Sequence, residues 1–244
     1  MSYSVERFDA RTWSDAQLDA MFGGAFPAFI TADAVARTYI GRVREWFANL
    51  NIMLVCGDQP VATGWGVPIR WNGEVSDLPS GYSDSLRRAV ELRESAGHAD
   101  TFVVCGAIVD PAMSRQGVAG ELIAALRDLP AASDLARVIA PVRPTLKATY
   151  PLTPIETFST WRRDDGLPLD PWLRTHVRIG GRVLASAPHS QTMTATVEEW
   201  ESWTSLTLPA TGHYVIPYGL SPLYIDREAN LGTYTEPNIW MQHR

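Results

Sequence analysis

The segment from Thr101 to Leu126 constrains the fold of this chain more than any other. It opens with the run TFVVCGAIV, which carries no charge and is typical of a strand buried on both faces. Asp110 and Pro111 stop this strand, and a short polar loop follows. Apolar residues then recur at helical spacing from Val118 to Leu129, which predicts an amphipathic helix. A buried strand that leads through a short turn into a helix indicates an α/β architecture.

The turn between this strand and this helix has the chemistry of a phosphate site. Backbone N–H groups at a helix N-terminus lack intrahelical partners, carry partial positive charge and point toward an approaching anion. Gly117, Ala119 and Gly120 have little or no side chain to block that approach, and Arg115 adds charge at the rim. The segment therefore predicts an anion-binding turn.

Several other kinds of site are not supported by the sequence. A P-loop needs Gly-Lys-Ser/Thr at the turn, whereas Gly120 is followed by Glu121, and the spacing also fails the dinucleotide fingerprint GxGxxG. The chain contains no GxSxG nucleophile elbow. Its histidines never show HxxxH spacing and it has no CxxC, so we expect no metal site.

Composition excludes further classes of protein. Of 244 residues, 45% are hydrophobic and 20% charged, as in globular rather than disordered or fibrous proteins. A net charge of −6 argues against nucleic-acid binding, which needs concentrated Lys and Arg. No apolar run approaches the roughly 18–20 residues of a membrane span, and from the N-terminal residues we expect no signal peptide. Because the only cysteines, Cys56 and Cys105, lie in apolar runs, we expect a cytoplasmic protein without disulfides.

Hydrophobic spacing predicts helices and strands on both sides of the central segment. Before it, we expect a strand over 3–8, a first helix capped by Ser14 or Asp15, and a second helix from Thr31 to Asn51. A hairpin over 51–71 and a helix over 83–95 follow. After it, we expect a strand over 137–142, a short helix over 153–161, a hairpin over 174–187, a helix that starts with a Thr196–Glu199 capping box, and a strand over 214–217. Residues 220–244 show no clear period.

Motif and element order together resemble the GCN5-related N-acetyltransferase (GNAT) superfamily. Its motif A has a strand with a V-D-P-like stop and then a Q/R-x-x-G-x-G/A loop that opens a helix. The chain has AIVDP over 107–111 and SRQGVAG over 114–120. The preceding strand, two helices and antiparallel hairpin come in the same order. The stretch DPWLRTH from Asp170 to His176 also resembles long actinobacterial members.

The resemblance implies an α/β (α+β) fold with a central mixed, mostly antiparallel, twisted sheet flanked by helices. We expect one domain over 1–244, with its core at about 1–187 and a C-terminal extension at about 188–244. The tail aromatics between Tyr214 and His243 can wall an acceptor pocket, cover a sheet edge or form the surface of a homodimer.

The resemblance also implies acetyl-CoA as co-substrate and a set of residues that hold it. In the superfamily the pantetheine arm pairs like an added strand with the end of the central strand, which implies contacts from Ile108 and Val109. The pyrophosphate lies on the loop amides, which implies contacts from Arg115, Gln116, Gly117, Val118, Ala119 and Gly120. Ser114 stands where the family prefers Gln or Arg, and this departure either weakens phosphate binding or leaves the phosphate contact to Arg115.

The sequence leaves the catalytic residues open. Family members often protonate the leaving thiolate with a Tyr in the helix after the next strand, but Trp161 stands at about that position, and an indole cannot serve as the acid. Tyr150 is a nearby substitute, or else a packed aromatic. His176 is a candidate base because of its accessible pKa, or else a strand-end His bonded to Asp170.

Two cations, Arg143 and Lys147, follow the strand over 137–142. They can hold an acidic substrate or the CoA phosphates, or form a solvated loop pair. The resemblance implies an acyl-CoA-dependent acyltransferase, most simply an N-acetyltransferase in which the amine of a small molecule attacks the thioester directly. Two alternatives stay open: a module that binds acyl-CoA or an acyl carrier without transfer, and an acyl-CoA decarboxylase on the same scaffold.

Overall fold

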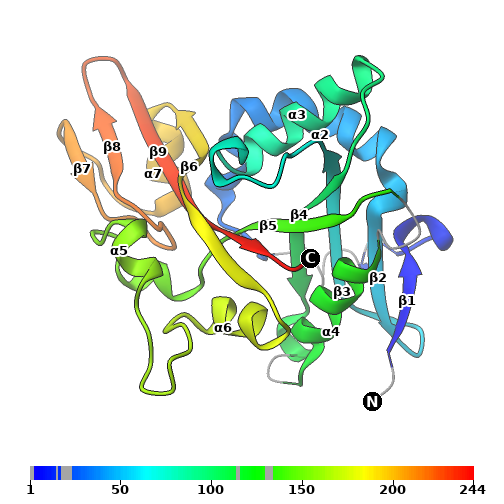
Figure 1. The fold of residues 1–244 in the computed structure, drawn as a ribbon. Coiled ribbons are helices and arrows are strands. Elements are labelled where there is room, and N and C mark those ends of the chain that lie inside the picture. Colours follow the sequence, from blue (N-terminus) through cyan, green and yellow to red (C-terminus); the bar gives the residue numbers. More distant parts are fainter. Residues whose placement is uncertain (1–2, 15, 18–23, 114–115, 130–133) are drawn as a thin grey trace.

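The strands of the described residues form one nine-stranded sheet with the order β1-β2-β3-β4-β5-β9-β8-β7, in which β6 pairs with β9 (Figure 1). The computed structural model describes residues 3–14, 16–17, 24–113, 116–129 and 134–244. Each pair of neighbouring strands is antiparallel except β4 and β5, which are parallel. The expected mixed, mostly antiparallel sheet is therefore confirmed.

The sheet is built from strands of very different length. The strands are β1 Ser4–Arg7, β2 Asn51–Cys56, β3 Gln59–Ile69, β4 Thr101–Val109, β5 Arg137–Val142, β6 Arg182–Ala195, β7 Gly212–Tyr214, β8 Leu223–Asp226 and β9 Leu231–Gln242. The α-helices are α2 Ala34–Trp46, α3 Tyr82–Glu94, α4 Val118–Asp128, α5 Ile155–Ser159, α6 Pro171–Arg178 and α7 Val197–Thr204. Short 3₁₀ turns include η2 Ala28–Ala32 and η7 Leu146–Thr149.

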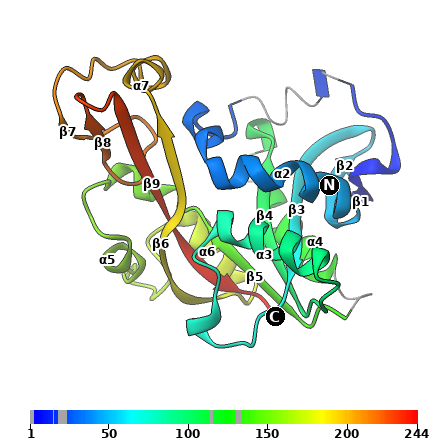
Figure 2. The same cartoon turned by 90° about the horizontal axis from the view of Figure 1, so that it is seen from above.

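Helices cover both faces of the sheet. Gly64 and Trp65 are neighbours on β3, so they point to opposite faces. A Cβ at Gly64 would meet Leu126 of α4, whereas the Trp65 ring makes an edge contact with Tyr82 of α3, with 6.1 Å between ring centroids. Helix α4 therefore lies on one face, and α3, packed beside α2, lies on the other. Figure 2 shows β6 to β9 and α7 on one side of the molecule and β1 to β4 on the other.

Sequence periodicity predicted the strands around the central segment well. The bounds of β4 and β5 coincide with the predictions, and the hairpin over 51–71 is confirmed as β2 and β3. The capping box of α7 is also confirmed, since the side chains of Thr196 and Glu199 each accept a hydrogen bond from the other residue's backbone N–H. Helix α2 is present, but Asp33 rather than Thr31 caps it, through a 2.9 Å bond from the Ala36 N–H. The first of the two helices expected before the hairpin falls largely on residues 18–23, outside the described ones.

The hairpin predicted over 174–187 is wrong. Residues 171–178 form α6, because the Asp170 carboxylate accepts hydrogen bonds from the N–H groups of Trp172 and Leu173 and Pro171 occupies the first turn. Gly180, with φ +91°, follows the end of the helix, and β6 begins at Arg182. His176 is therefore helical and does not end a strand.

The residues after 187 are part of the main sheet. Strand β6 runs through position 187 without a break, and β9 pairs with β5 on one edge and with β6 on the other. The sequence of β9 lacks a clear period because eight of its twelve residues are buried, from both faces. No helix in the described part of the chain is long and apolar enough to cross a lipid bilayer.

Candidate active site

Strands β4 and β5 pair over only three residues and then separate. The parallel pairing joins Thr101 to Val103 with Arg137 to Ile139, whereas β4 continues to Val109 and β5 to Val142. A β-bulge at Cys105 lies at the start of the separation, since Gly66 pairs with Val104 and Trp65 with Gly106. A bulge bends its strand and increases the local twist, which moves the end of β4 away from β5.

The separation leaves one edge of β4 without a partner strand. Residues 104–109 pair with β3 on one side, and on the other side no described strand pairs with them. Each of these residues is half-buried. Ile108 and Val109, the predicted pantetheine contacts, belong to this edge. Unpaired N–H and C=O groups in an extended strand can accept an extended ligand as an additional strand.

The N-terminus of α4 follows directly after this edge. Gly117 precedes the helix with φ +82°, a left-handed conformation that favours glycine. Its carbonyl accepts from the N–H groups of Gly120 at 2.9 Å and Glu121 at 3.2 Å, while those of Val118 and Ala119 have no partner among the described residues. A Cβ at Gly117 or Gly120 would meet nothing within 4 Å. The turn is thus open to an anion.

The other residues of this loop are only partly within the described structure. Ser114 and Arg115 lie outside the described residues, so the predicted contact from Arg115 stays a prediction. The Gln116 side chain is exposed and donates to the Ala112 carbonyl at 3.2 Å. Val118 is 1% exposed, and its side chain packs in the core and fixes the first turn of α4.

Tyr150 and Trp161 belong to one aromatic cluster. Their rings meet edge to face with centroids 4.9 Å apart, and Phe158 of α5 lies 5.2 Å from Trp161. Tyr150 is 38% exposed, and its hydroxyl forms no hydrogen bond within the described structure. Trp161 therefore packs as an aromatic, and Tyr150 keeps a free proton donor.

His176 is buried, with 3% of its surface exposed. Its Nδ1 lies 2.8 Å from Nε2 of His243, and its ring contacts Trp172. Burial and the neighbouring His243 lower the pKa of His176 to about 3, and burial lowers that of His243 to about 4. These rings belong to the packing between α6 and the end of β9, so we assign His176 no catalytic role.

Arg143 and Lys147 are both bound to other groups of the chain. Arg143 forms an ion pair with Glu236 of β9, and its Nη2 donates to the Tyr218 carbonyl at 2.6 Å. Lys147 is 1% exposed, and its Nζ donates to the carbonyls of Tyr150 and Leu220. Lys147 therefore links the carbonyls of residues 150 and 220 and has a structural role. Arg143 stays partly exposed beside the opening, which is the gap where β4 separates from β5.

Hydrophobic periodicity does not identify Glu236, because it lies in the stretch without a clear period. Glu236 is 1% exposed and also accepts from the Tyr234 hydroxyl. Burial raises its pKa, and the nearby Arg143 opposes that rise. An acidic residue inside the run TYTEPNIWM is the signal that marks a buried, paired carboxylate.

A polar seam joins β6 and β9 to the helices on the face opposite α4. Ser190 accepts from the Tyr82 N–H at 2.9 Å and donates to Asn238 of β9. Asp33, 1% exposed, accepts from the Ser83 hydroxyl and from the Gln191 side chain at 3.4 Å. This seam fastens β6 and β9 to α2 and α3.

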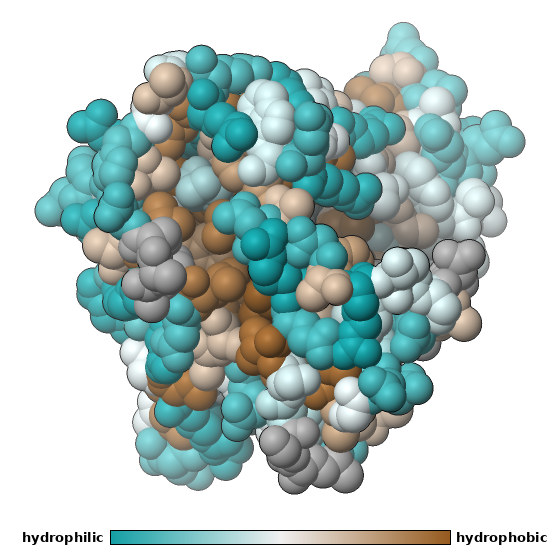
Figure 3. Space-filling view, turned by 90° about the vertical axis from the view of Figure 1, so that its right-hand side faces the viewer, coloured by the Kyte–Doolittle hydropathy of each residue, from teal (hydrophilic) through white to brown (hydrophobic). Residues whose placement is uncertain are grey.

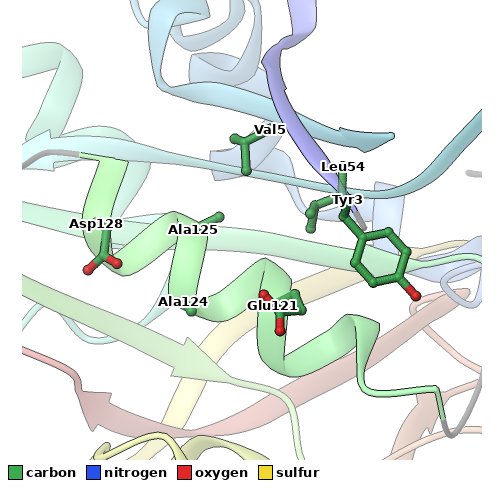
Figure 4. Close-up of a pocket in the computed structure, with 7 residues that line it drawn as sticks. All are labelled: Tyr3, Val5, Leu54, Glu121, Ala124, Ala125 and Asp128. Atoms are coloured by element: carbon green, nitrogen blue, oxygen red, sulfur yellow. The ribbon is translucent and has the colours of Figure 1, made fainter. Parts of the chain in front are cut away.

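A hollow of about 430 Å³ lies elsewhere, along the flank of α4. It is lined by Tyr3, Val5, Leu54, Glu121, Ala124, Ala125 and Asp128 (Figure 4). On the right-hand side of the molecule as seen in Figure 1, hydrophobic residues gather near the middle of the surface (Figure 3). This hollow is next to the helix side rather than at its N-terminus, and we assign it no role.

Comparison with known proteins decides the family. A curated arginine N-acetyltransferase of Aspergillus versicolor is 30% identical over 247 residues, which cover 89% of this chain and 84% of the relative. The chain belongs to the GNAT superfamily. A scan against protein-family models matched none of them.

Two solved GNAT-like structures share the fold. The loading GNATL domain of CurA from Lyngbya majuscula is 13% identical with a TM-score of 0.59, over 100% of this chain and 98% of that one. The GphF GNAT-like decarboxylase in complex with isobutyryl-CoA is 15% identical with a TM-score of 0.50, over 78% of this chain and 90% of that one.

This GNAT protein is an acyl-CoA-dependent N-acetyltransferase, with acetyl-CoA as its co-substrate. The edge of β4 and the turn before α4 are the parts of its geometry that suit an acyl-CoA. The decarboxylase and loading-domain neighbours share the fold without favouring either alternative function over transfer.

Proposed function

We propose that this enzyme transfers an acetyl group from acetyl-CoA to the primary amine of a small, positively charged amino acid, with arginine as the first candidate. The observation that carries the donor part is the edge of β4 over residues 104–109, with which no described strand pairs. It lies next to the N–H groups of Val118 and Ala119, which have no partner among the described residues. The name of the curated relative supports arginine as acceptor.

The donor lies along β4 in this proposal. Ile108 and Val109 pair with the pantetheine arm, whose amides continue the sheet. The N–H groups of Val118 and Ala119 hold the pyrophosphate, together with Arg115 and the neighbouring Gln116. Both Gly117 and Gly120 leave space for that approach.

The acceptor enters from the face of the sheet opposite α4. Glu236 and Asn238 of β9 and Ser190 of β6 lie on that face. Arg143 uses Nε for Glu236 and Nη2 for the Tyr218 carbonyl, while its Nη1 has no acceptor within the described structure. This free group suits the carboxylate of an amino acid. Lys147 does not contribute, because its ammonium is occupied.

The chemical step follows from these positions. The acceptor ammonium first loses a proton, and the neutral amine attacks the thioester carbonyl carbon. The C–N bond forms, the C–S bond breaks, and the CoA thiolate takes up a proton. Tyr150 remains our candidate donor of that proton. The products are the N-acetylated amino acid and free CoA.

Calorimetric titration with acetyl-CoA and CoA is the first test, followed by thiol release from acetyl-CoA with L-arginine. We expect micromolar binding and an acetylarginine product confirmed by mass. Absence of binding at millimolar ligand would overturn the donor site. Binding of acetyl-CoA without transfer would favour a binding module. Consumption of malonyl-CoA in the absence of an acceptor, without release of the CoA thiol, would favour a decarboxylase.

The location of the enzyme is a separate proposal. Both Cys56 and Cys105 are free thiols, which fits the reducing cytoplasm that we expect. A homodimer stays a prediction, and Tyr234 and Trp240 do not support it, since both rings are buried within the subunit.

A further inference from the structure

Tyr218 is a large aromatic residue in an unusual place. Its side chain is 73% exposed, and its ring contacts no other aromatic ring in the part of the chain that the structure describes. It therefore contributes little to the packing of the subunit. A single exposed aromatic needs no explanation by itself, but the backbone of Tyr218 does.

Tyr218 occupies a turn position that favours glycine. The Gly219 N–H donates to the Ile216 carbonyl at 3.1 Å and closes a four-residue turn with Pro217 at its second position. Tyr218, the third residue, has φ +63°. A turn with Pro second and positive φ third normally has Gly or Asn there, because a Cβ is unfavourable in the left-handed region. In this chain the glycine comes one residue later.

The surrounding contacts hold Tyr218 in this conformation. Its carbonyl accepts from Arg143 Nη2 at 2.6 Å, and Arg143 is fixed by its ion pair with the buried Glu236. Two residues on, the Leu220 N–H donates to the Tyr234 hydroxyl at 2.7 Å, and the Leu220 carbonyl accepts from Lys147. Unfavourable backbone conformations that are held by their surroundings occur preferentially at ligand sites.

These contacts also place Tyr218 at the rim of the active-site opening. Arg143 directly follows β5, four residues beyond Ile139, the last residue paired with β4. At about 3.3 Å per residue, that is about 13 Å along the strand from the point of separation. An acceptor whose α-carboxylate binds the Arg143 guanidinium lies beside the backbone of Tyr218, so its side chain can reach the Tyr218 ring.

We propose that Tyr218 determines acceptor specificity, with its ring stacked on a planar cationic group, a guanidinium, at the far end of the acceptor. The face of a tyrosine ring attracts a cation, and a guanidinium stacks on it better than an ammonium does. This inference rests on the proposed function and adds the recognition of the acceptor side chain.

The test compares Tyr218→Asn and Tyr218→Phe with the wild-type enzyme. Asn tolerates positive φ but lacks the ring, so we expect Tyr218→Asn to unfold at the same or a higher temperature. Its kcat/KM for L-arginine should fall about tenfold, with a smaller change for L-lysine and an unchanged KM for acetyl-CoA. Tyr218→Phe keeps the ring and should stay within about threefold of wild type.

Tyr224→Thr is the matched control. Tyr224 is another partly exposed tyrosine, on β8, and its ring contacts His213 rather than the rim. Thr keeps a strand-forming residue there. The kcat/KM values for L-arginine and for L-lysine should therefore both remain unchanged.

The outcomes separate this inference from the proposed function. Equal selectivity for arginine over lysine in Tyr218→Asn and wild type would overturn the role of Tyr218 while leaving arginine acetylation intact. If the wild-type enzyme acetylated only amines that lack a guanidinium, the stacking would be overturned while acetyl transfer stayed intact. A wild-type enzyme that neither binds CoA nor releases thiol would overturn the proposed function, and the acceptor role of Tyr218 with it.

Discussion

Gly117 combines a backbone requirement and a ligand requirement at one position. It takes the left-handed conformation before α4, and a side chain there would point into open space. Gly117→Glu therefore puts a negative charge where we place the pyrophosphate. Because an unfavourable interaction of about 1.4 kcal/mol is a factor of ten, we expect acetyl-CoA affinity to fall at least about tenfold in calorimetric titration.

Gly117→Gln separates charge from backbone strain. Its side chain has the same shape and meets the same left-handed φ, but it lacks the negative charge. We expect it to bind acetyl-CoA several-fold more tightly than Gly117→Glu. Equal affinity of the glutamate variant and the wild-type enzyme would show that the pyrophosphate lies elsewhere.

Trp161 stands where the family often has a catalytic tyrosine, and its contacts are those of a packed ring. Trp161→Phe keeps an aromatic in the cluster with Tyr150 and Phe158. We expect kcat within about threefold of wild type, since the indole donates no proton to the leaving group. A loss of several hundred-fold, with the circular dichroism spectrum preserved, would show a direct role for Trp161.

At the scale of single elements, the caps of α6 and α7 differ in how much they stabilise the protein. Asp170 is 1% exposed; besides capping α6, it accepts from the Leu146 N–H at 2.6 Å and so joins α6 to η7. Thr196 caps only α7, at the surface. We expect Thr196→Ala to cost about 1 kcal/mol of unfolding free energy. Asp170→Ala should cost about 2–4 kcal/mol, because it leaves buried donors without a partner.

Urea denaturation of both variants measures this difference. Asp170→Asn is the matched control, since its side-chain oxygen can still accept from the N–H groups of α6. We expect it to retain part of the lost stability. An Asp170→Ala variant no less stable than Thr196→Ala would show that the tie to η7 contributes nothing.

Element prediction from sequence succeeded where short-range chemistry decides the structure. The charge-free run of β4, the helical spacing of α4 and the Thr196 capping box each lie within one continuous stretch. The hairpin predicted over 174–187 is wrong because Asp170 and Pro171 start a helix just before it, and this helix-start signal outweighs the apolar arms.

At the scale of the whole molecule, the sequence predicts the proposed donor site but not the proposed acceptor site. Residues 108–120 form one continuous motif, so the sequence alone predicts that they lie near the CoA. The proposed acceptor site combines Arg143 after β5, Ser190 of β6 and Glu236 of β9 with the turn at Tyr218. Their proximity depends on β9 lying between β5 and β6, and no local pattern in the sequence encodes that pairing.

The pair formed by buried His176 and half-buried His243 makes the stability of the whole molecule depend on pH. Their folded pKa values of about 3 and about 4 lie below the unfolded value of about 6.5. As the pH falls below about 6.5, the unfolded chain binds protons that the folded chain excludes. Their contribution to stability is therefore fully present above that pH and is lost as the pH falls toward 4 and 3.

Each neutral histidine adds a slope of up to about 1.4 kcal/mol per pH unit within this window. We expect His243→Gln to show a shallower fall of the unfolding free energy between pH 6 and 4.5 than the wild-type enzyme. His98 is exposed, so His98→Gln should retain the wild-type slope. Urea denaturation at a series of pH values compares the three proteins. The comparison uses the slope of the unfolding free energy with pH, so a loss of stability that is the same at every pH does not affect the result. Equal slopes in wild type and His243→Gln would contradict the assignment of this pH dependence to the histidine pair.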